Sequence, residues 1–262
     1  MKKYGVLSLV IVSACTTAKQ SATSIPSSSI VVDGKLFTSM FQQKAAEYKA
    51  LCFQAYNIAR ERVNQARVGS KPMAIITDID ETVLDNSPYA VHQALHGKDY
   101  DPSSWYEWTA MAIADSVPGA PSFFKYASKK GITIFYVTNR DEREKKVTLQ
   151  NLVKFDLPNA DNEHLMMRQT ISSKEERRQH IMSQYDVLLL IGDNLADFSN
   201  LFDKKPQEER DKNIHQTMSM FGERFIILPN PNYGDWEPAF YNKSGLSLHQ
   251  KDSILKTGLK YY

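Results

Sequence analysis

The sequence predicts an α/β fold in which helices cover both faces of a mostly parallel sheet, with a small, mainly helical cap beside it. Two observations support this prediction. Short apolar segments at 73–77, 132–137, 187–191 and 225–228 have the length of buried strands, and helical stretches separate them. Polar residues directly follow three of these segments, as expected where chemistry gathers beyond the carboxyl ends of parallel strands.

Length and composition favour a single domain of this kind. The chain has 262 residues, 42% hydrophobic and 24% charged, which suffices for one α/β domain with a small insertion. The formal net charge is +2, and Lys2 and Lys3 account for it, so the chain from residue 15 onward sums to 2 − 2 = 0. A neutral mature chain gives no reason to expect a polyanion such as nucleic acid as a partner.

The N-terminus predicts export. A short basic start precedes an apolar run at 6–12 and small residues that end at Cys15, which is the order of an export signal. The run is far shorter than the ~20 apolar residues that span a bilayer. The segment 12–15, VSAC, resembles the bacterial lipobox, which implies a signal peptide at 1–14 and lipid, palmitate included, on the Cys15 sulfur. The alternative is an ordinary signal peptide cut nearby, with Cys15 as an incidental thiol.

We expect the mature chain to begin with a tether and a helix. Residues 15–32 are rich in Ser, Thr and Ala and lack aromatics, which favours a flexible tether ahead of a domain at 33–262. Apolar residues recur at helical spacing over 36–68, which predicts one long helix or two. Because a lipidated Cys15 leaves Cys52 without a disulfide partner, we expect Cys52 in the core.

Two carboxylates end the first strand candidate. Asp78 and Asp80 lie one residue apart where a buried apolar segment meets a turn. Two acids there are costly to leave unpaired, and a hard cation such as Mg²⁺, which selects oxygen ligands, would offset their repulsion. Alternatively, they cap a helix, the more frequent role of an isolated Asp-x-Asp.

A second acidic pair weakens that alternative. Asp193 and Asp197 follow another apolar segment more than a hundred residues later, so two acidic pairs at two strand ends predict one metal site. Between them, Thr138 and Asn139 follow a third strand candidate, where a hydroxyl and backbone N–H groups suit phosphate oxygens. Lys174 opens a helix before the Asp193 strand and would add a positive charge.

These segments resemble a known family. Asp78-Ile79-Asp80-Glu81-Thr82, Thr138, Lys174 and Gly192-Asp193-Asn194 resemble, in order and spacing, the four motifs of the haloacid dehalogenase-like (HAD) superfamily. The two Asp pairs, the lipobox, Asp85-Asn86-Ser87, Pro118-Gly119-Ala120 and Leu228-Pro229-Asn230 resemble the class C, or DDDD-type, acid phosphatases, a bacterial outer-membrane lipoprotein group. This resemblance implies a Rossmannoid parallel sheet, a Mg²⁺-dependent phosphatase and, by resemblance alone, allows a homodimer. Thr138 replaces the more frequent Ser and keeps the hydroxyl.

The resemblance implies a role for each site residue. Asp78 would attack phosphorus and form an aspartyl-phosphate, while Asp80 would act first as general acid and then as general base. The Asp78 carboxylate, the Asp80 backbone carbonyl and Asp193 would hold Mg²⁺. Asp197 would support the metal waters or orient Lys174. The phosphate would be bound by Thr138, Asn139 and Lys174.

Aromatic residues near the motifs point to a flat substrate. The insertion at 88–117 is too long for an ordinary connection of roughly 2 to 6 residues, so we expect it to form a cap packed with the helix at 36–68. Tyr89, Trp105 and Tyr233 are the first candidates to stack on a ring, although such residues equally pack a cap. The resemblance implies nucleoside 5′-monophosphates, nicotinamide mononucleotide and aryl phosphates as substrates, and hence 5′-nucleotidase activity.

Two other functions compete with hydrolysis. The same residues would serve a phosphotransferase that uses an acceptor alcohol instead of water. A surface-binding lipoprotein that has lost turnover is the second alternative, because fold alone does not settle function. Against it, Asp78, Asp80, Thr138 and Asp193 are all of the required type. In that case five histidines would be the candidate haem ligands, although none lies in a sequence context typical of such a ligand: His92, His96, His164, His180 and His215.

Overall fold

The computed structural model describes residues 29–67 and 69–262. Its first two helices are α1 (Ile30–Lys44) and α2 (Ala46–Gln65), and the chain bends between them at Ala45, whose backbone is extended. The helical pattern at 36–68 thus corresponds to two helices. The tether was expected to extend to residue 32. This boundary is wrong, because Val31 and Val32 are buried within α1. The signal peptide, Cys15 and the tether residues 16–28 lie outside the described residues.

The central sheet is parallel throughout. Its order is β5-β4-β1-β6-β7, formed by Leu165–Arg168, Thr133–Asp141, Met73–Thr77, Asp186–Gly192 and Phe225–Ile227. Four of these strands match the four predicted segments. The predicted parallel α/β sheet is confirmed.

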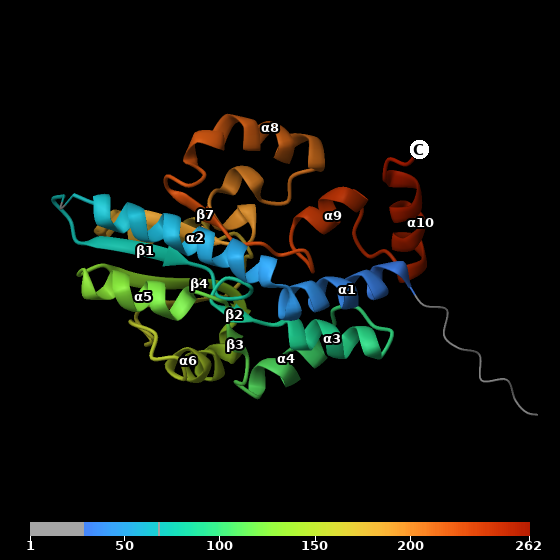
Figure 1. Cartoon of the computed structure of the whole chain (residues 1–262), viewed down its shortest axis with the longest axis horizontal. Coiled ribbons are helices and arrows are strands. Elements are labelled where there is room, and N and C mark those ends of the chain that lie inside the picture. The colour runs from blue at the N-terminus through green and yellow to red at the C-terminus, as the bar shows by residue number, and fades with distance from the viewer. Residues whose placement is uncertain (1–28, 68) are drawn as a thin grey trace, which may run out of the picture.

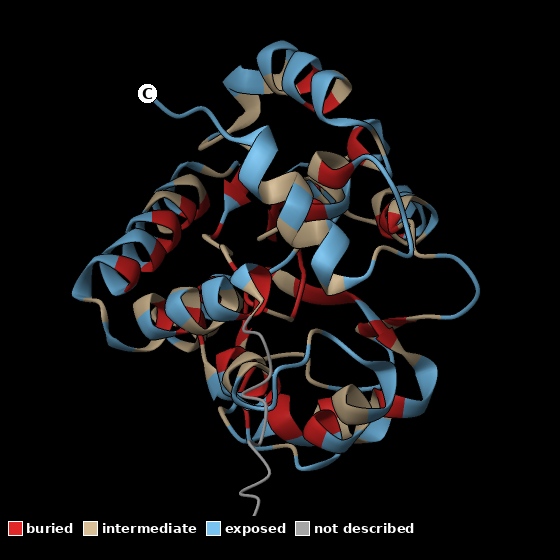
Figure 2. Ribbon diagram, turned by 90° about the vertical axis from the view of Figure 1, so that its right-hand side faces the viewer, coloured by how far each residue is buried: buried red, intermediate tan, exposed pale blue. Residues whose placement is uncertain are grey.

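Apolar side chains alternate between the two faces of the sheet and form a core on each. Figure 2 colours the buried residues of the ribbon red. In β1, Ile75 faces the larger core, where α2, α5 (Ala120–Lys129) and α6 (Lys145–Val153) pack, and Ile76 faces the smaller one, where α7 (Glu175–Gln184) packs. Cys52 is fully buried in the larger core, as expected. The two cores hold β1 and β6 rigidly at the sheet centre, and these two strands carry the acidic pairs.

The insertion after β1 is mainly helical. It contains α3 (Ser87–Leu95) and α4 (Pro102–Ala110), and a two-stranded ribbon of β2 (Leu84–Asp85) and β3 (Asp115–Ser116) joins it to the sheet. The Asp101 carboxylate caps α4 by accepting the Ser104 N–H at 2.9 Å. Helix α1 packs along α3 (Figure 1).

The C-terminal segment returns to the same end of the sheet. After α8 (Gln207–Thr217) and β7, the chain forms α9 (Trp236–Tyr241) and α10 (Leu248–Gly258), and α10 lies against α1 (Figure 1). The described part of the chain also contains four short 3₁₀ turns: Glu142–Glu144, Leu195–Asp197, Asn200–Phe202 and Met218–Met220. Within residues 29–67 and 69–262, no helix is both long and apolar enough to cross a bilayer.

Candidate active site

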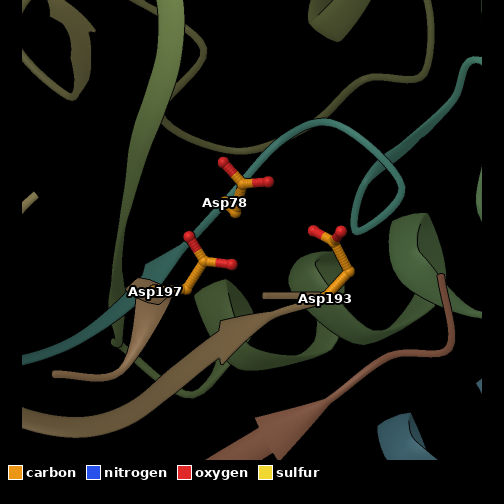
Figure 3. A group of neighbouring side chains, drawn as sticks. All are labelled: Asp78, Asp193 and Asp197. Carbon is orange, nitrogen blue, oxygen red and sulfur yellow. The ribbon is translucent and has the colours of Figure 1, made fainter. Parts of the chain in front are cut away.

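Three carboxylates meet at the carboxyl ends of β1 and β6 (Figure 3). The two strands are neighbours, and the Asp78 N–H donates to the Ile191 carbonyl at 2.9 Å, which places Asp78 beside the segment that begins with Asp193. Asp197 lies in the 3₁₀ turn that follows. One carboxylate oxygen from each of Asp78, Asp193 and Asp197 lies within 4.8 Å of the others. Asp78 from the first acidic pair and both members of the second, which lie far apart in the sequence, therefore form one cluster.

Burial makes this cluster a site of high negative potential. Desolvation raises the pKa of Asp78 to about 7, even though Lys174 acts in the opposite direction. Desolvation, together with the negative charges of Asp78 and Asp197, also raises the pKa of Asp193 well above its usual value. A hard cation would remove this penalty, and the ligands offered are all oxygen atoms. The donor set therefore fits a Mg²⁺-like ion.

Lys174 supplies the one cation in direct contact with the cluster among the described residues. Its amino group donates to Asp78 Oδ1 and, at 2.6 Å, to Asp197 Oδ1. Burial opposes a charge on this amine, but the two carboxylates outweigh it, and the pKa of Lys174 is raised. Asp197 also accepts the Asn194 N–H at 3.0 Å. It thus contacts both the lysine and the turn after β6. Its role, to orient Lys174 or to support the metal waters, stays a prediction.

Asp80 points to different partners. Its carboxylate accepts from Arg140 Nη2 at 2.7 Å and Nε at 3.0 Å, and from Asn86 Nδ2 at 2.9 Å. The Asp80 side chain is therefore not part of the three-carboxylate cluster; the backbone carbonyl assigned to the metal by the resemblance stays a prediction. Arg140 is 3% exposed and was not singled out from the sequence. An arginine directly after the predicted Thr138-Asn139 pair was the available signal.

The predicted phosphate-binding residues differ in their access to the cavity that opens above the carboxylates. Asn139 and Lys174 line it, whereas the Thr138 side chain is fully buried and its hydroxyl accepts the Arg140 N–H at 3.1 Å. Arg177, on α7, donates to the Thr138 carbonyl at 2.6 Å and to Asn139 Oδ1 at 2.8 Å. Arg177 therefore fixes the strand end on which the predicted phosphate site depends.

A cavity of about 1260 Å³ opens above the carboxylates, and the three aromatic candidates line it. Trp105 packs edge-on against Tyr89, with ring centroids 5.1 Å apart, and the Tyr89 ring is nearly buried. Tyr233 is 36% exposed and lies on the C-terminal segment across from the cap. Trp108, by contrast, packs inside the cap and donates to Asn86 Oδ1 at 2.8 Å. The cavity therefore has a cap wall and a C-terminal wall, each with an aromatic ring.

Glu81 is a second residue that the sequence did not single out for a role. It is 1% exposed, its backbone has φ of 57°, and its carboxylate accepts the Tyr233 hydroxyl and, at 2.7 Å, the Asn86 N–H. Burial, reinforced by the charge of Asp80, raises the pKa of Glu81 to about 8. Glu81 thus links the ring of Tyr233 to the segment that carries Asp80.

The histidines proposed as haem ligands are not part of this site. None of the five is among the described residues that line the cavity. His92 and His96 stack on each other at 4.4 Å on the exposed side of α3.

Comparisons with known proteins agree with this geometry. The family model for the HAD superfamily, subfamily IIIB (acid phosphatase), matches residues 10–236. The class C acid phosphatase from Bacillus anthracis is 38% identical with a TM-score of 0.85, and the match covers 88% of this chain and 99% of that one. A tungstate-bound structure of the Bacillus anthracis class C acid phosphatase is 37% identical with a TM-score of 0.84, and the match covers 88% and 98% of the two chains.

Two curated plant proteins also match. Acid phosphatase 1 of Solanum lycopersicum is 30% identical over 78 residues, and vegetative storage protein 2 of Arabidopsis thaliana is 26% identical over 178 residues. These matches cover 30% and 63% of this chain, and 31% and 63% of the respective relatives. The match to the family, together with the fold shared with class C enzymes, confirms the predicted resemblance: the chain belongs to the acid phosphatases of subfamily IIIB in the HAD superfamily.

Proposed function

We propose that this protein is a Mg²⁺-dependent phosphomonoesterase that hydrolyses small phosphomonoesters through an aspartyl-phosphate on Asp78. The observation that carries the proposal is that Asp78 lines the cavity, binds Lys174 and lies beside the other two carboxylates. Among the described residues, only one of the two Asp78 carboxylate oxygens receives a hydrogen bond. The other oxygen is therefore available to attack phosphorus.

The reaction then has two displacements. In the first, the Asp78 carboxylate forms a bond to phosphorus, the bond to the ester oxygen breaks, and Asp80 gives its proton to the leaving alcohol. In the second, Asp80 takes a proton from water, the water oxygen bonds to phosphorus, and the bond to Asp78 breaks to release inorganic phosphate. Lys174 stabilises the phosphoryl charge, while Arg140 and Asn86 hold Asp80 in place.

Mg²⁺ would be held by the Asp78 carboxylate, the Asp80 carbonyl and Asp193. When bound, it would neutralise charge on the phosphoryl oxygens. Asp193 is already oriented for this role, because its two oxygens accept from Thr82 Oγ1 at 3.2 Å and Asn230 Nδ2 at 2.8 Å.

We further propose nucleoside 5′-monophosphates, nicotinamide mononucleotide and aryl phosphates as substrates. The support is that Trp105 and Tyr233 line the cavity from different walls. A flat ring held between them would place its phosphate near Asp78.

The bacterial outer membrane, with lipid on Cys15, is proposed as the location on the sequence of residues 1–15 alone.

The deciding assay measures phosphate release from these substrates with Mg²⁺ or with EDTA, for the wild type and for Asp78→Asn. We expect release that requires both Mg²⁺ and Asp78. Added alcohol acceptors separate hydrolysis from phosphotransfer, because transfer would yield a new phosphomonoester in place of inorganic phosphate. Folded wild-type protein that releases phosphate from none of these compounds would exclude the proposal and favour a binding lipoprotein.

A second experiment tests the lipid anchor. It compares palmitate labelling of the wild type with that of Cys15→Ser.

A further inference from the structure

Helix α1 contacts both walls of the cavity through one of its faces. Lys35 and Gln42 lie about two turns apart on this helix, so their side chains point to the same side. Each binds one residue of the segment between β1 and α4 and one residue of the C-terminal segment after β7. Figure 1 shows α1 between the cap helix α3 and the C-terminal helices α9 and α10.

Gln42 makes the inner of these two bridges. Its Nε2 donates to Asp85 Oδ1 at 2.8 Å, and its Oε1 accepts from Asn232 Nδ2 at 2.9 Å. Gln42 and Asn232 are each 2% exposed, so both amides are committed to these partners. Asp85 in turn accepts the Ser87 N–H at 2.8 Å, at the start of α3. A single buried amide therefore ties the base of the cap to the C-terminal segment.

The C-terminal end of this bridge reaches the site itself. The Asn232 N–H donates to Asn230 Oδ1 at 2.9 Å, and Asn230 Nδ2 donates to Asp193 at 2.8 Å. Tyr233, the aromatic residue of that wall, directly follows Asn232. On the cap side, Ser87 opens the helix that carries Tyr89. The two ends of the Gln42 bridge, Asn232 and Asp85, thus lie one and four residues along the chain from Tyr233 and Tyr89.

Lys35 makes the outer bridge in the same way. Its amino group binds Asp99, in the loop before α4, at 2.6 Å and Glu237, on α9, at 3.1 Å. Lys251, on α10, binds the same two acids at 2.6 and 3.4 Å. Because two bridges lie two turns apart, α1 fixes both the separation and the tilt of the walls.

We propose that α1 sets the width of the substrate cavity, with Gln42 as a positioning residue that determines affinity for ring-bearing substrates without touching them. Gln42 is not among the residues that line the cavity. A ring must fit between walls to within a few tenths of an ångström to keep its dispersion contacts, whereas a phosphate group is fixed by Asp78 and Lys174 at the floor. The inference rests on the proposed phosphatase function.

The test compares the full-length wild type with Gln42→Ala, Gln42→Glu and Gln43→Ala. Gln42→Glu keeps the size and the acceptor for Asn232 but loses the donor to Asp85. Gln43→Ala is the matched control, because among the described residues the side chain of the neighbouring Gln43 hydrogen-bonds only to the cap side, at Ser87 Oγ, 3.0 Å away. KM and kcat are measured on p-nitrophenyl phosphate, on a nucleoside 5′-monophosphate and on glycerol 2-phosphate, which has no ring. Cooperative thermal unfolding is required of each variant, so Gln42→Glu carries the test should the alanine variant not fold.

Both Gln42 variants should raise KM for the two ring substrates about fivefold or more, with kcat and the glycerol 2-phosphate kinetics changed less than about twofold. Gln43→Ala should match the wild type. Equal losses on all three substrates, or no loss on any, would overturn the inference. Quenching of tryptophan fluorescence by a nucleoside monophosphate, in an Asp78→Asn background, reports the same affinity change without turnover. A wild type that releases no phosphate would reject the proposed function instead, so the two failures are distinguishable.

Discussion

Lys174 compensates the negative charge of two buried carboxylates in the site. Its amino group lies between Asp78 and Asp197, both of which are less than a tenth exposed. Without a cation at that point, the carboxylates would repel each other or take up a proton. The same charge would face the transferring phosphoryl group, so one residue serves both the stability of the site and its chemistry.

Lys174→Met should therefore reduce both activity and stability. Loss of the charge facing the phosphoryl group should lower kcat about 100-fold or more. Loss of one partner from a buried ion pair should lower the free energy of unfolding by about 3 kcal/mol at neutral pH. Steady-state kinetics and urea denaturation measure the two effects. Lys212→Met, at an exposed position on α8, is the control and should change neither. A kcat within tenfold of the wild type would contradict the assigned role.

At the residue level, the sequence was most informative where chemistry sits next to a strand. Asp78, Asp80 and Asp193 were predicted because two acidic pairs follow two apolar strand candidates, whereas a single pair more often caps a helix. Arg140, Asn86 and Glu81 were given no individual role. Contacts such as those of Arg140 with Asp80 and of Glu81 with Tyr233 join distant segments, so spacing along the chain does not reveal them. Trp108 illustrates the same limit, since only the structure separates an aromatic residue that packs the cap from one that lines the cavity.

At the scale of elements, the positions of four strands followed from apolar runs, although β4 extends to Asp141, beyond the predicted 132–137. Strand β1 was predicted to the residue because MAIIT is continuously apolar up to the threonine. Strand β5, LMMR, was missed because it is short, only alternate residues are buried, and its methionines favour no strand. The bend between α1 and α2 has no glycine or proline at Ala45, so the sequence left one helix or two open. Packing of α1 on the cap provides the reason for the bend.

The turn after β6 depends on the absence of a side chain at Gly192. A Cβ at this position would lie 2.3 Å from Asp197 Oδ2 and 2.5 Å from Asp197 Cβ, far inside contact distance. The glycine therefore allows the 3₁₀ turn to fold back and bring Asp197 next to Asp78.

Gly192→Ala should displace Asp197 and break its bond to the Asn194 N–H. The three carboxylates would then separate, so Mg²⁺ should bind at least about tenfold more weakly, with a loss of about 1 to 3 kcal/mol in stability. Isothermal titration with Mg²⁺ and thermal unfolding measure these effects. The control is Gly34→Ala on α1, where a Cβ meets nothing within 4 Å; it should stabilise the helix slightly. Unchanged Mg²⁺ affinity in Gly192→Ala would separate Asp197 from the metal site.

On the scale of the whole molecule, ion pairs beside the cavity join helix α1 and the cap to the C-terminal helices. Lys35 near the start of α1, Asp99 in the cap, Glu237 on α9 and Lys251 on α10 form four ion pairs, with each side chain at most 21% exposed. The sequence predicted a cap packed with the N-terminal helical segment, yet gave no sign that α9 and α10 would join it. These four residues carry no shared motif, and their approach depends on how the whole sheet is ordered.

This charge cluster should make stability depend on pH in the acid range. Burial opposes the charge on Asp99, but Lys35 and Lys251 outweigh it and lower the pKa of Asp99 from 3.8 to about 2. The folded state therefore favours the carboxylate, so the stabilisation is present above pH 3.8 and is lost as the pH falls through about 2. A shift of this size corresponds to about 2 kcal/mol.

In urea denaturation, Asp99→Asn should be less stable than the wild type by about 2 kcal/mol at pH 5 and by less than about 1 kcal/mol at pH 2.5. The variant removes only this titration, so the other acids of the protein cancel in the comparison. An equal difference at both pH values would mean that Asp99 contributes through hydrogen bonds alone, and that its charge does not hold the cap to the C-terminal helices.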